Sequence, residues 1–404
     1  MNTMLKKCKK YKRSGLPTIA KRAGLYPYFN TISSEQGPIV TMNNKDIIML
    51  GSNNYLGMTG HPEVKRRAID AIEEFGVGTT GSRLLNGTFQ LHAALEERLA
   101  KFLGKEDCIV FSTGMQANLG AIAALISPNH DEWVISDELN HASIIDGLTL
   151  AKIPKDKKII FKHNDVDDLS EKIKFAPKGN SIIITEGIFS MEGDISPMDE
   201  IVSIAKKHDA MIYLDDAHGV GVLGPHGQGT AAHHNVTKDV DIIMGTFSKS
   251  FASCGGYIAA SKEICNWVRH KARAFIFSAS IPPSNCATVL AVLDIIEKDN
   301  SYQQNLKLVS DRMRDGLVQE GFEIGKSTTP IIPVIVGDDI KAFKFFKKLL
   351  NRKPVGVFTN PIRAPAVPEG RELLRTSYMA TMTPEIIDQA LEVFSEVGKK
   401  MKMI

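Results

Sequence analysis

Residues 181–219 read SIIITEGIFSMEGDISPMDEIVSIAKKHDAMIYLDDAHG, and this stretch decides the fold class. Its two ends, 181–187 and 210–219, contain short apolar runs that are typical of strands buried on both faces of a sheet. Between them, residues 197–209 carry apolar side chains at helical spacing. A strand, a helix and a second strand in this order predict two parallel strands joined by a crossover helix.

The same alternation continues in both directions along the chain. Further strands are predicted at 108–112, 133–137, 158–164 and 241–249. Further helices are predicted at 61–75, 91–104, 114–126, 142–152 and 165–176. The pattern predicts an α/β fold whose mostly parallel sheet is covered by helices on both faces.

The last part of the chain has a different pattern. Long helices are predicted at 285–299 and 304–321, followed by strands at 329–337 and 372–380 and helices at 341–352 and 384–401. We therefore expect three parts, which are an N-terminal segment, a large domain and a smaller C-terminal α+β domain, at residues 1–50, 51–284 and 285–404.

The composition limits the class of protein. The chain has 404 residues, 43% of them hydrophobic and 24% charged, as in a globular protein with a large core. A net charge of +3 argues against a nucleic-acid binder, which needs a concentrated basic face. The five cysteines lack the spacing of a zinc site, and their odd number favours a reducing cytoplasm without disulfides. No apolar window reaches about 18 residues, so no transmembrane helix is expected.

The N-terminal residues 1–13, MNTMLKKCKKYKR, contain six basic side chains and no acidic one. The interpretation that we favour is a solvated, frayed terminus. The alternative is weak peripheral attraction to the anionic inner surface of a membrane, worth about 1 kcal/mol per basic residue. This second interpretation matters if the substrate is a lipid.

Unusual polar residues lie where ligands bind in such sheets, at the carboxyl ends of the strands. They are Glu186, Asp215, His218 and Lys249. The acids and the histidine are, by themselves, equally consistent with metal ligands or with a salt-bridge cluster. Lys249 adds an amine among the small residues of TFSKSFASCGG (246–256). A carboxylate that keeps a pyridinium nitrogen protonated and an amine that forms a Schiff base are what pyridoxal phosphate needs.

A candidate phosphate site completes this set. In STGMQAN (112–118), the residues Thr113, Gly114 and Met115 begin a predicted helix, whose first backbone N–H groups have no partner within the helix. The glycine permits close approach of a phosphate. Thr246 and Ser248, just before the lysine, add hydroxyl donors. By itself, such a turn is usually only a helix start.

Taken together, these stretches resemble the α-oxoamine synthases, a branch of the fold-type-I pyridoxal-phosphate enzymes. The similarity extends from about residue 25 to the C-terminus and is carried by SNNYLGM (52–58), GSRLLNGTFQLHAALE (81–96), ELNHASIIDG (138–147), TEGIFSMEGDISPM (185–198), LDDAHGVGVLG (214–224) and TFSKSFASCGG (246–256). The resemblance implies a fold-type-I transferase with pyridoxal 5'-phosphate as cofactor, and a homodimer whose active site lies at the subunit interface.

The resemblance also implies a role for each matching residue. Lys249 corresponds to the lysine that binds the cofactor and later acts as acid and base. Asp215 corresponds to the partner of the pyridine nitrogen, and His218 to the hydrogen-bond donor to the phenolic oxygen. His141 corresponds to the imidazole stacked on the cofactor ring; its alternative interpretation is a histidine at a helix start.

Further residues follow from the same resemblance. Glu186 and Ser190 correspond to cofactor-site residues, and Ser278 to a phosphate ligand donated by the partner subunit. Asn53 and Arg375 correspond to the grip on the substrate carboxylate, which agrees with the need of an arginine on an apolar strand for an anionic partner. Residue 363, also an arginine, is expected to assist them or, alternatively, to be a solvated loop residue.

The implied reaction is the decarboxylative condensation of an amino acid with an acyl-CoA thioester. The stretches GLYPYF (24–29) and APAVPEGRELLRTSYMAT (364–381) look most like serine palmitoyltransferase, which joins L-serine and palmitoyl-CoA to give 3-oxosphinganine. The alternatives are 8-amino-7-oxononanoate synthase, which uses L-alanine and a pimeloyl thioester, and 2-amino-3-ketobutyrate ligase, which uses glycine and acetyl-CoA.

Two hypotheses of another kind also remain. One is a non-catalytic partner subunit, which the presence of Lys249 together with Asp215 and His218 disfavours. The other is an aminotransferase or desulfurase of the same fold, which the stretches NHASIIDG (140–147) and GTFSK (245–249) disfavour.

Overall fold

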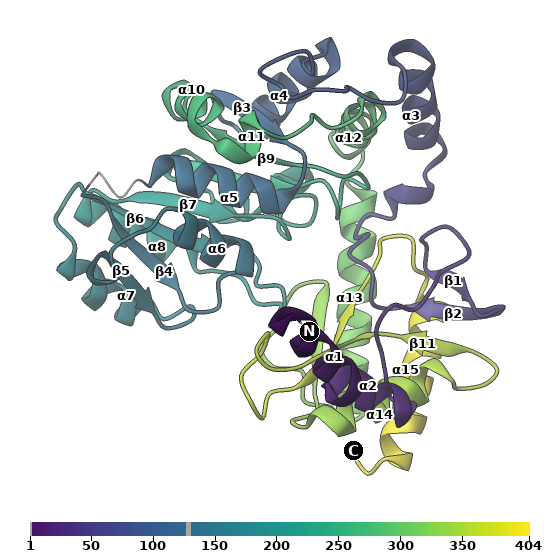
Figure 1. The fold of residues 1–404 in the computed structure, drawn as a ribbon. Coiled ribbons are helices and arrows are strands. Elements are labelled where there is room, and N and C mark those ends of the chain that lie inside the picture. The colour runs from purple at the N-terminus through teal and green to yellow at the C-terminus, as the bar shows by residue number, and fades with distance from the viewer. Residues whose placement is uncertain (1, 127–130) are drawn as a thin grey trace.

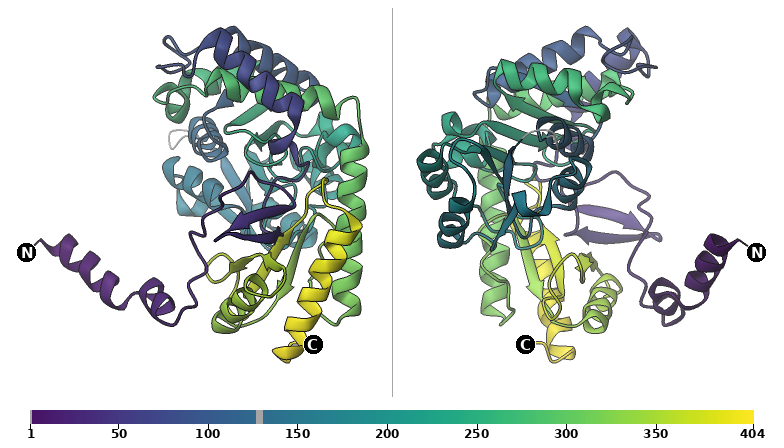
Figure 2. Two further views of the ribbon diagram at one scale, coloured as in Figure 1. Left: turned by 90° about the vertical axis from the view of Figure 1, so that its right-hand side faces the viewer. Right: turned by 60° about the vertical axis from the view of Figure 1, so that its left-hand side comes forward.

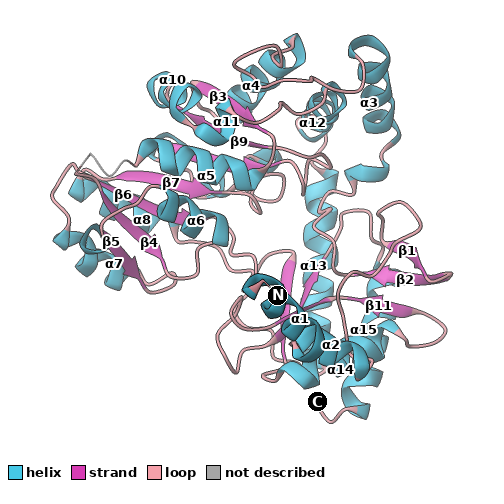
Figure 3. Cartoon of the chain, in the orientation of Figure 1, coloured by secondary structure: helices cyan, strands magenta, loops and turns pink. Residues whose placement is uncertain are grey.

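The computed structural model of the chain describes residues 2–126 and 131–404. Figure 1 shows a larger body built on one sheet and a smaller body that holds the C-terminus, with helix α13 (Ser301–Gln319) running from one to the other. Figure 3 shows that the strands of the larger body form a central layer between helices.

The larger body contains a seven-stranded sheet in the order β3-β9-β8-β7-β6-β4-β5. The strands are β3 (Asp107–Phe111), β4 (Trp133–Asp137), β5 (Lys158–Phe161), β6 (Ser181–Glu186), β7 (Met211–Asp215), β8 (Ile242–Thr246) and β9 (Gly256–Ala260). Strands β5, β4, β6, β7 and β8 pair in parallel, and β9 runs antiparallel to both β8 and β3. The predicted mostly parallel sheet is therefore confirmed, but β9 was not predicted.

Alternate residues of the central strands support two separate cores. In β6, Ile182 and Ile184 belong to one hydrophobic cluster and Ile183 to the other, so the strand is buried on both faces. The first face is covered by α5 (Gly114–Leu125), α6 (Ala142–Leu150), α10 (Lys262–Lys271) and α11 (Arg273–Ile276). The second face is covered by α7 (Val166–Lys172), α8 (Met198–His208) and the short α9 (Thr230–His233).

The smaller body contains two three-stranded sheets in the orders β10-β13-β12 and β1-β2-β11. Their strands are β1 (Ile39–Met42), β2 (Lys45–Met49), β10 (Ile331–Ile335), β11 (Gly356–Phe358), β12 (Asn360–Ile362) and β13 (Leu373–Ser377). A third hydrophobic cluster includes residues of these two sheets and of six further helices. They are α3 (Pro62–Phe75), α4 (Gln90–Phe102), α12 (Pro283–Ile296), α13, α14 (Asp339–Leu350) and α15 (Pro384–Lys400).

The N-terminus differs from the expectation. The basic run forms helix α1 (Thr3–Ser14), followed by α2 (Leu16–Arg22), and Figure 2 shows both projecting from the rest of the molecule. No residue of α1 is buried, so it is solvated as expected, but the expectation of a frayed chain was wrong. The side chain of Asn2 caps the helix by accepting from the N–H of Met4, and Lys12 and Arg13 complement the negative end of its dipole.

The carboxyl ends of β6, β7 and β8 come together at one edge of the large sheet. Glu186 lies opposite Asp215 in register, and Asp215 lies opposite Met244. The strand predicted over 210–219 ends at Asp215, because the chain then turns and the N–H of Gly219 donates to the carbonyl of Asp216. This turn carries His218 over the strand ends. Within the described residues, no helix has the length and apolar character needed to cross a membrane.

Candidate active site

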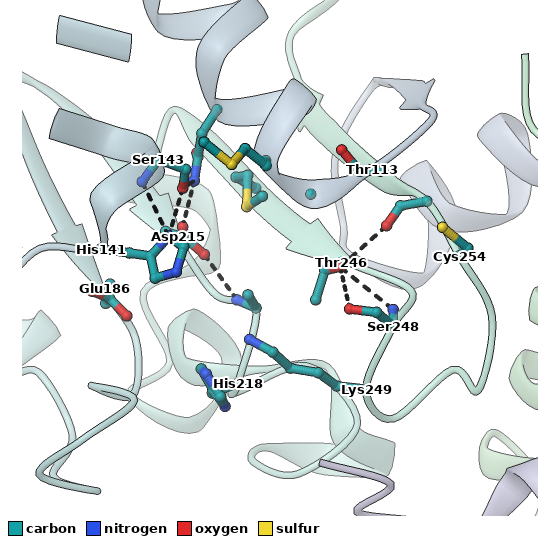
Figure 4. A pocket seen from close by; sticks show the side chains of 16 residues that line it. Thr113, His141, Ser143, Glu186, Asp215, His218, Thr246, Ser248, Lys249 and Cys254 are labelled. Atoms are coloured by element: carbon teal, nitrogen blue, oxygen red, sulfur yellow. Dashed lines mark hydrogen bonds between the residues drawn. The ribbon is translucent and has the colours of Figure 1, made fainter. Parts of the chain in front are cut away.

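Lys249 lies in a tight loop, residues 247–255, that joins β8 to the antiparallel β9. The N–H of Phe247 donates to the carbonyl of Gly255 at 3.0 Å, and the N–H of Ser253 donates to the carbonyl of Phe247 at 2.9 Å. Glycine is required at the end of this loop, because a Cβ on Gly255 would lie 2.5 Å from Cδ2 of Phe247. The closed loop fixes the backbone of Lys249 while its side chain extends into a cavity (Figure 4).

This first cavity has a volume of about 300 Å³ and lies at the carboxyl edge of the large sheet. It contains ten of the residues predicted for the site, namely Thr113, Gly114, Met115, His141, Glu186, Asp215, His218, Thr246, Ser248 and Lys249. They come from positions spread over more than a hundred residues of sequence, and the sheet topology brings them together. This agrees with the prediction that the site lies at the carboxyl ends of the strands.

The carboxylate of Asp215 is buried and held by two donors. Asn118 Nδ2 donates to Asp215 Oδ2 at 2.7 Å, and the N–H of Ala217 donates to Oδ1 at 3.1 Å. Asn118 is itself oriented, since it accepts from the hydroxyl of Tyr213 at 2.8 Å and donates to Ser143 Oγ at 2.8 Å. These bonds fix the direction of a buried carboxylate that no lysine or arginine neutralises by direct contact among the described residues.

Burial and neighbouring charges shift the pKa values of titratable side chains in the cavity. Burial lowers the pKa of Lys249 to about 8, although the carboxylates of Asp215 and Glu186 act in the opposite direction. Burial, together with the charge of Asp215, raises the pKa of Glu186 well above its usual range. A substantial part of Lys249 is therefore neutral near pH 8.

His218 is held as a neutral imidazole with a defined tautomer. Burial lowers its pKa well below the usual range, and the charges of Lys249 and Arg375 lower it further. Its Nδ1 lies 2.7 Å from the hydroxyl of Tyr55, which accepts a hydrogen bond from Arg375 at 3.3 Å. Because an arginine can only donate, the hydroxyl hydrogen of Tyr55 goes to one of two acceptors, His218 Nδ1 or Asn53 Oδ1 at 3.3 Å, and His218 Nδ1 is the nearer of the two. The remaining hydrogen of His218 is then on Nε2, as a donor that Tyr55 does not engage.

His141 serves as the N-cap of helix α6. Its Nδ1 accepts from the N–H of Ser143 at 3.2 Å and lies 2.7 Å from the Ser143 hydroxyl. The interpretation of this residue as a helix-start histidine is thus correct for its backbone position. Its ring nevertheless lines the cavity, and burial lowers its pKa, so a neutral, flat imidazole faces the space beside Asp215.

The opposite end of the cavity has the properties of a phosphate site. Thr113 is the N-cap of α5 and accepts from the N–H of Gln116 at 3.1 Å, which leaves other N–H groups of the first turn free. A Cβ on Gly114 would lie 2.9 Å from Thr246, so only glycine allows this helix start to approach the hydroxyls. Thr246 Oγ1 and Ser248 Oγ are 3.0 Å apart beside it. Donors without competing acids suit an anionic group.

A second cavity of about 500 Å³ adjoins the first one and shares His141, His218 and Lys249 with it. Its lining includes three further predicted residues, Asn53, Ser190 and Arg375. Arg375 is buried on β13, and its guanidinium donates to the carbonyl of Ser190 and to the hydroxyl of Tyr55.

Within the described residues, no acidic side chain forms an ion pair with Arg375. A buried guanidinium bound only by neutral acceptors leaves its positive charge without a counterion. The second cavity is therefore suited to the carboxylate of a small ligand whose other end reaches Lys249.

Two predicted residues lie apart from both cavities. Arg363 forms an ion pair with Asp339 at 2.7 Å, and Ser278 accepts from Gln116 Nε2 at 3.0 Å. Neither side chain lines the two cavities of this single chain. Ser278 nevertheless lies beside the first turn of helix α5, because it bonds to Gln116 in that turn.

Sequence reasoning missed three residues that orient the site, Tyr55, Asn118 and Ser143. Tyr55 and Asn118 lie within the stretches SNNYLGM and STGMQAN, but a single sequence gives no sign of what their side chains contact. Asn118 lies one helical turn after Gly114, on the face of α5 that packs on the sheet, where a fully buried amide needs partners. That burial is the signal that could have identified it.

The comparisons with known proteins agree with this geometry. Residues 45–394 match the model of the aminotransferase class I and II family. Serine palmitoyltransferase from Bacteriovorax stolpii is 49% identical over 377 residues, which are 93% of this chain and 88% of the relative. The 8-amino-7-oxononanoate synthase from Thermosipho melanesiensis is 41% identical, covering 95% of this chain and 96% of the relative.

A solved structure gives the same result. Serine palmitoyltransferase from S. paucimobilis, with PLP and myriocin bound, superposes with a TM-score of 0.93 and 34% sequence identity over 100% of both chains. The fold class predicted from the sequence, a fold-type-I α/β transferase, is therefore confirmed. The chain belongs to the aminotransferase class I and II family and, within it, to the α-oxoamine synthases, as the resemblance of its sequence predicted.

Proposed function

We propose that this chain uses pyridoxal 5'-phosphate to condense L-serine with palmitoyl-CoA, giving 3-oxosphinganine, CoA and CO₂. The observation that carries the proposal is the pair of joined cavities, with Lys249 between a buried carboxylate and a buried, unpaired guanidinium. The first cavity fits the cofactor and the second one fits an amino acid. The relatives named serine palmitoyltransferase support serine as the donor.

The residues of the first cavity fit the cofactor group by group. The free N–H groups at the start of α5 and the hydroxyls of Thr246 and Ser248 would hold its phosphate. Asp215 would bind the ring nitrogen, His218 Nε2 would donate to the phenolic oxygen, and His141 would lie on the ring. When bound, the cofactor withdraws electrons from Cα of the amino acid and so acidifies its proton.

The side chains of the protein then divide the work of the reaction. Arg375 and Asn53 hold the substrate carboxylate in the second cavity, which directs Cα toward Lys249. Lys249, whose amine would hold the cofactor, is positioned where it would remove the Cα proton as a base and return a proton after CO₂ has left. A pKa of about 8 suits both steps, because the two protonation states are then similarly populated near pH 8.

A second candidate is 8-amino-7-oxononanoate synthase, since a relative with that name is 41% identical over nearly the whole chain. L-Alanine differs from L-serine by one hydroxyl. The two candidates therefore share every residue discussed so far, and only the choice of donor and acyl chain distinguishes them. Glycine with acetyl-CoA is the third combination within the family.

We further propose that the chain forms a homodimer. Five apolar side chains are exposed on neighbouring segments, and they are Val77, Leu84, Leu85, Met115 and Phe277, of which Met115 also lines the first cavity. The segments that carry them are joined, since Ser82 bridges to Ala279 and Gln116 bonds to Ser278. Exposed apolar groups gathered in this way favour a protein interface. This apolar patch would place Ser278 beside the phosphate end of the site of the partner subunit.

The first test of the function is the release of CoA by the purified, PLP-loaded protein with each combination of donor and acyl-CoA. We expect L-serine with palmitoyl-CoA to give the highest kcat/KM, and the variant Lys249→Ala to release no CoA. A preference for L-alanine with a pimeloyl thioester would select the second candidate instead. Absence of CoA release with every combination would contradict the proposal and favour a non-catalytic subunit.

The pH dependence of cofactor attachment tests the environment of Lys249. Only the neutral amine attacks a carbonyl, so the rate at which the apo protein binds PLP covalently should rise with pH and level off above about 8. The charge of Asp215 raises the pKa of Lys249, and therefore Asp215→Asn should move the midpoint to lower pH. Stopped-flow absorbance measures both profiles. A midpoint near the ordinary value for lysine would contradict the assigned environment.

The dimer is tested by Leu85→Asp, which places a charge in the apolar patch. We expect monomers in sedimentation velocity and a loss of retained PLP, because the phosphate end of the site is then open to solvent. Ile340→Asp is the matched control, since Ile340 is also exposed but lies on α14 of the smaller body. A dimeric L85D protein would exclude the patch as the interface.

We place the enzyme in the cytoplasm and propose weak contact of helix α1 with anionic membranes. The helix exposes Met4, Leu5 and Tyr11 beside six basic residues. In flotation with vesicles, the protein should bind phosphatidylglycerol but not phosphatidylcholine, and high salt should release it. The triple variant K6Q/K9Q/K10Q should lose this binding, and the control K152Q/K155Q/K158Q should keep it. Equal binding by the two variants would rule out α1 as the contact.

A further inference from the structure

A loop between β6 and α8, residues 187–196, reaches the second cavity and is stabilised by its own backbone. Ile188 and Ile195 form a β-bridge, the N–H of Phe189 donates to the carbonyl of Asp194 at 3.1 Å, and the N–H of Gly193 donates to the carbonyl of Phe189 at 2.9 Å. We call it the β6–α8 loop. Its tip presents the Ser190 carbonyl to the site.

The β6–α8 loop follows strand β6 of the large sheet and is hydrogen-bonded to Arg375 on strand β13. The Nε of Arg375 donates to the carbonyl of Ser190, and this bond and the one to Tyr55 are the two that orient the guanidinium. The loop also contacts the smaller body through Thr329, whose hydroxyl donates to the carbonyl of Gly193 at 2.8 Å. A displacement of the tip of the loop would therefore turn the guanidinium, while none of residues 188–195 lines the cofactor cavity.

On the side away from the substrate, one histidine ties this loop to the sheet. His163 Nε2 lies 2.9 Å from Asp194 Oδ2, and its Nδ1 lies 3.2 Å from Asp137 Oδ1 at the end of β4. Its ring packs edge-on against Phe189, with the centroids 4.3 Å apart. The adjacent Asn164 donates to Asp194 Oδ2 at 3.1 Å. Asp137 is completely buried, so the histidine bridges a buried acid and a loop acid.

The two acids keep this bridge charged. Burial alone lowers the pKa of an imidazole, but the hydrogen bonds to Asp137 and Asp194 raise the pKa of His163 to about 10. Both ring nitrogens are then donors over the whole physiological range. Without the imidazolium, Asp137 and Asp194 would face each other across the same space without a cation between them, which would push the loop outward.

We infer that His163 is a positioning residue for the substrate carboxylate, because it fixes the β6–α8 loop whose Ser190 carbonyl orients Arg375. This inference rests on the proposed function, in which Arg375 holds that carboxylate. His163 lines neither the first nor the second cavity. Its expected effect is therefore on the binding of the amino acid, and not on the binding of the cofactor or on proton transfer by Lys249.

The test compares two ligands in the PLP-loaded protein by the change in visible absorbance on binding. L-Serine carries the carboxylate that Arg375 would hold, and ethanolamine is the same molecule without it. In His163→Gln, we expect the Kd of L-serine to rise about tenfold, the size of one weakened hydrogen bond to a charged group, and the Kd of ethanolamine to stay within about twofold. The KM of L-serine should rise with it, while kcat changes little.

A matched control is His234→Gln, which breaks another histidine–aspartate pair, His234 with Asp199 at 3.2 Å, whose members both lie outside the β6–α8 loop. If H163Q does not fold, Asp194→Asn removes the loop end of the bridge and keeps the pair of His163 with Asp137. In either variant, amide hydrogen exchange of the apo protein should become faster in residues 187–196.

Two results would overturn the inference. One is an equal loss of affinity for L-serine and ethanolamine, which would show a general structural effect, and the other is unchanged affinity for both with unchanged exchange in the loop. If the wild-type protein itself bound L-serine no better than ethanolamine, the carboxylate grip and the proposed function would fail first, so the two failures are distinguishable.

Discussion

The burial of Asp215 at the end of β7 is the constraint on which the rest of the site depends. A carboxylate without water costs several kcal/mol unless hydrogen bonds replace its hydration. Asn118 and the N–H of Ala217 supply those bonds, and Tyr213 and Ser143 fix the amide of Asn118. Burial raises the pKa of Glu186 and lowers that of Lys249 to about 8, and the negative charge of Asp215 strengthens the first shift and opposes the second. One fixed charge thus contributes to the protonation of two neighbours.

Much of the fold could be predicted because its central strands are buried on both faces. Continuous apolar runs such as Ser181–Glu186 separate clearly from the helical spacing of Met198–His208. Strand β9 was missed because YIAA (257–260) follows a glycine pair, which indicates a turn, and its antiparallel pairing depends in part on the distant strand β3. Helix α1 was missed because a basic run at a chain terminus is typical of a solvated, frayed end, whereas its N-cap Asn2 favours a helix.

The candidate site was predicted in part, and the division has a physical cause. Residues at strand ends, such as Glu186 and Lys249, could be placed because the topology of a parallel sheet fixes where those ends meet. Tyr55 and His163 could not, since each acts through contacts between segments far apart in the chain. Tyr55 meets a histidine 163 positions later, and His163 meets Asp194 across 31 positions. No local pattern specifies such pairs.

The hydroxyl of Tyr55 connects the two halves of the site electrostatically. It bonds to His218, which belongs to the large sheet, and to Arg375, which belongs to β13 of the smaller body. The charge of Arg375 is one of the causes that lower the pKa of His218. In the proposed function, an anion bound to Arg375 would offset that contribution, so the imidazole would become a stronger hydrogen-bond acceptor toward Tyr55. Binding of a carboxylate in one cavity would therefore alter the hydrogen bonding of His218 in the other without any movement of the backbone.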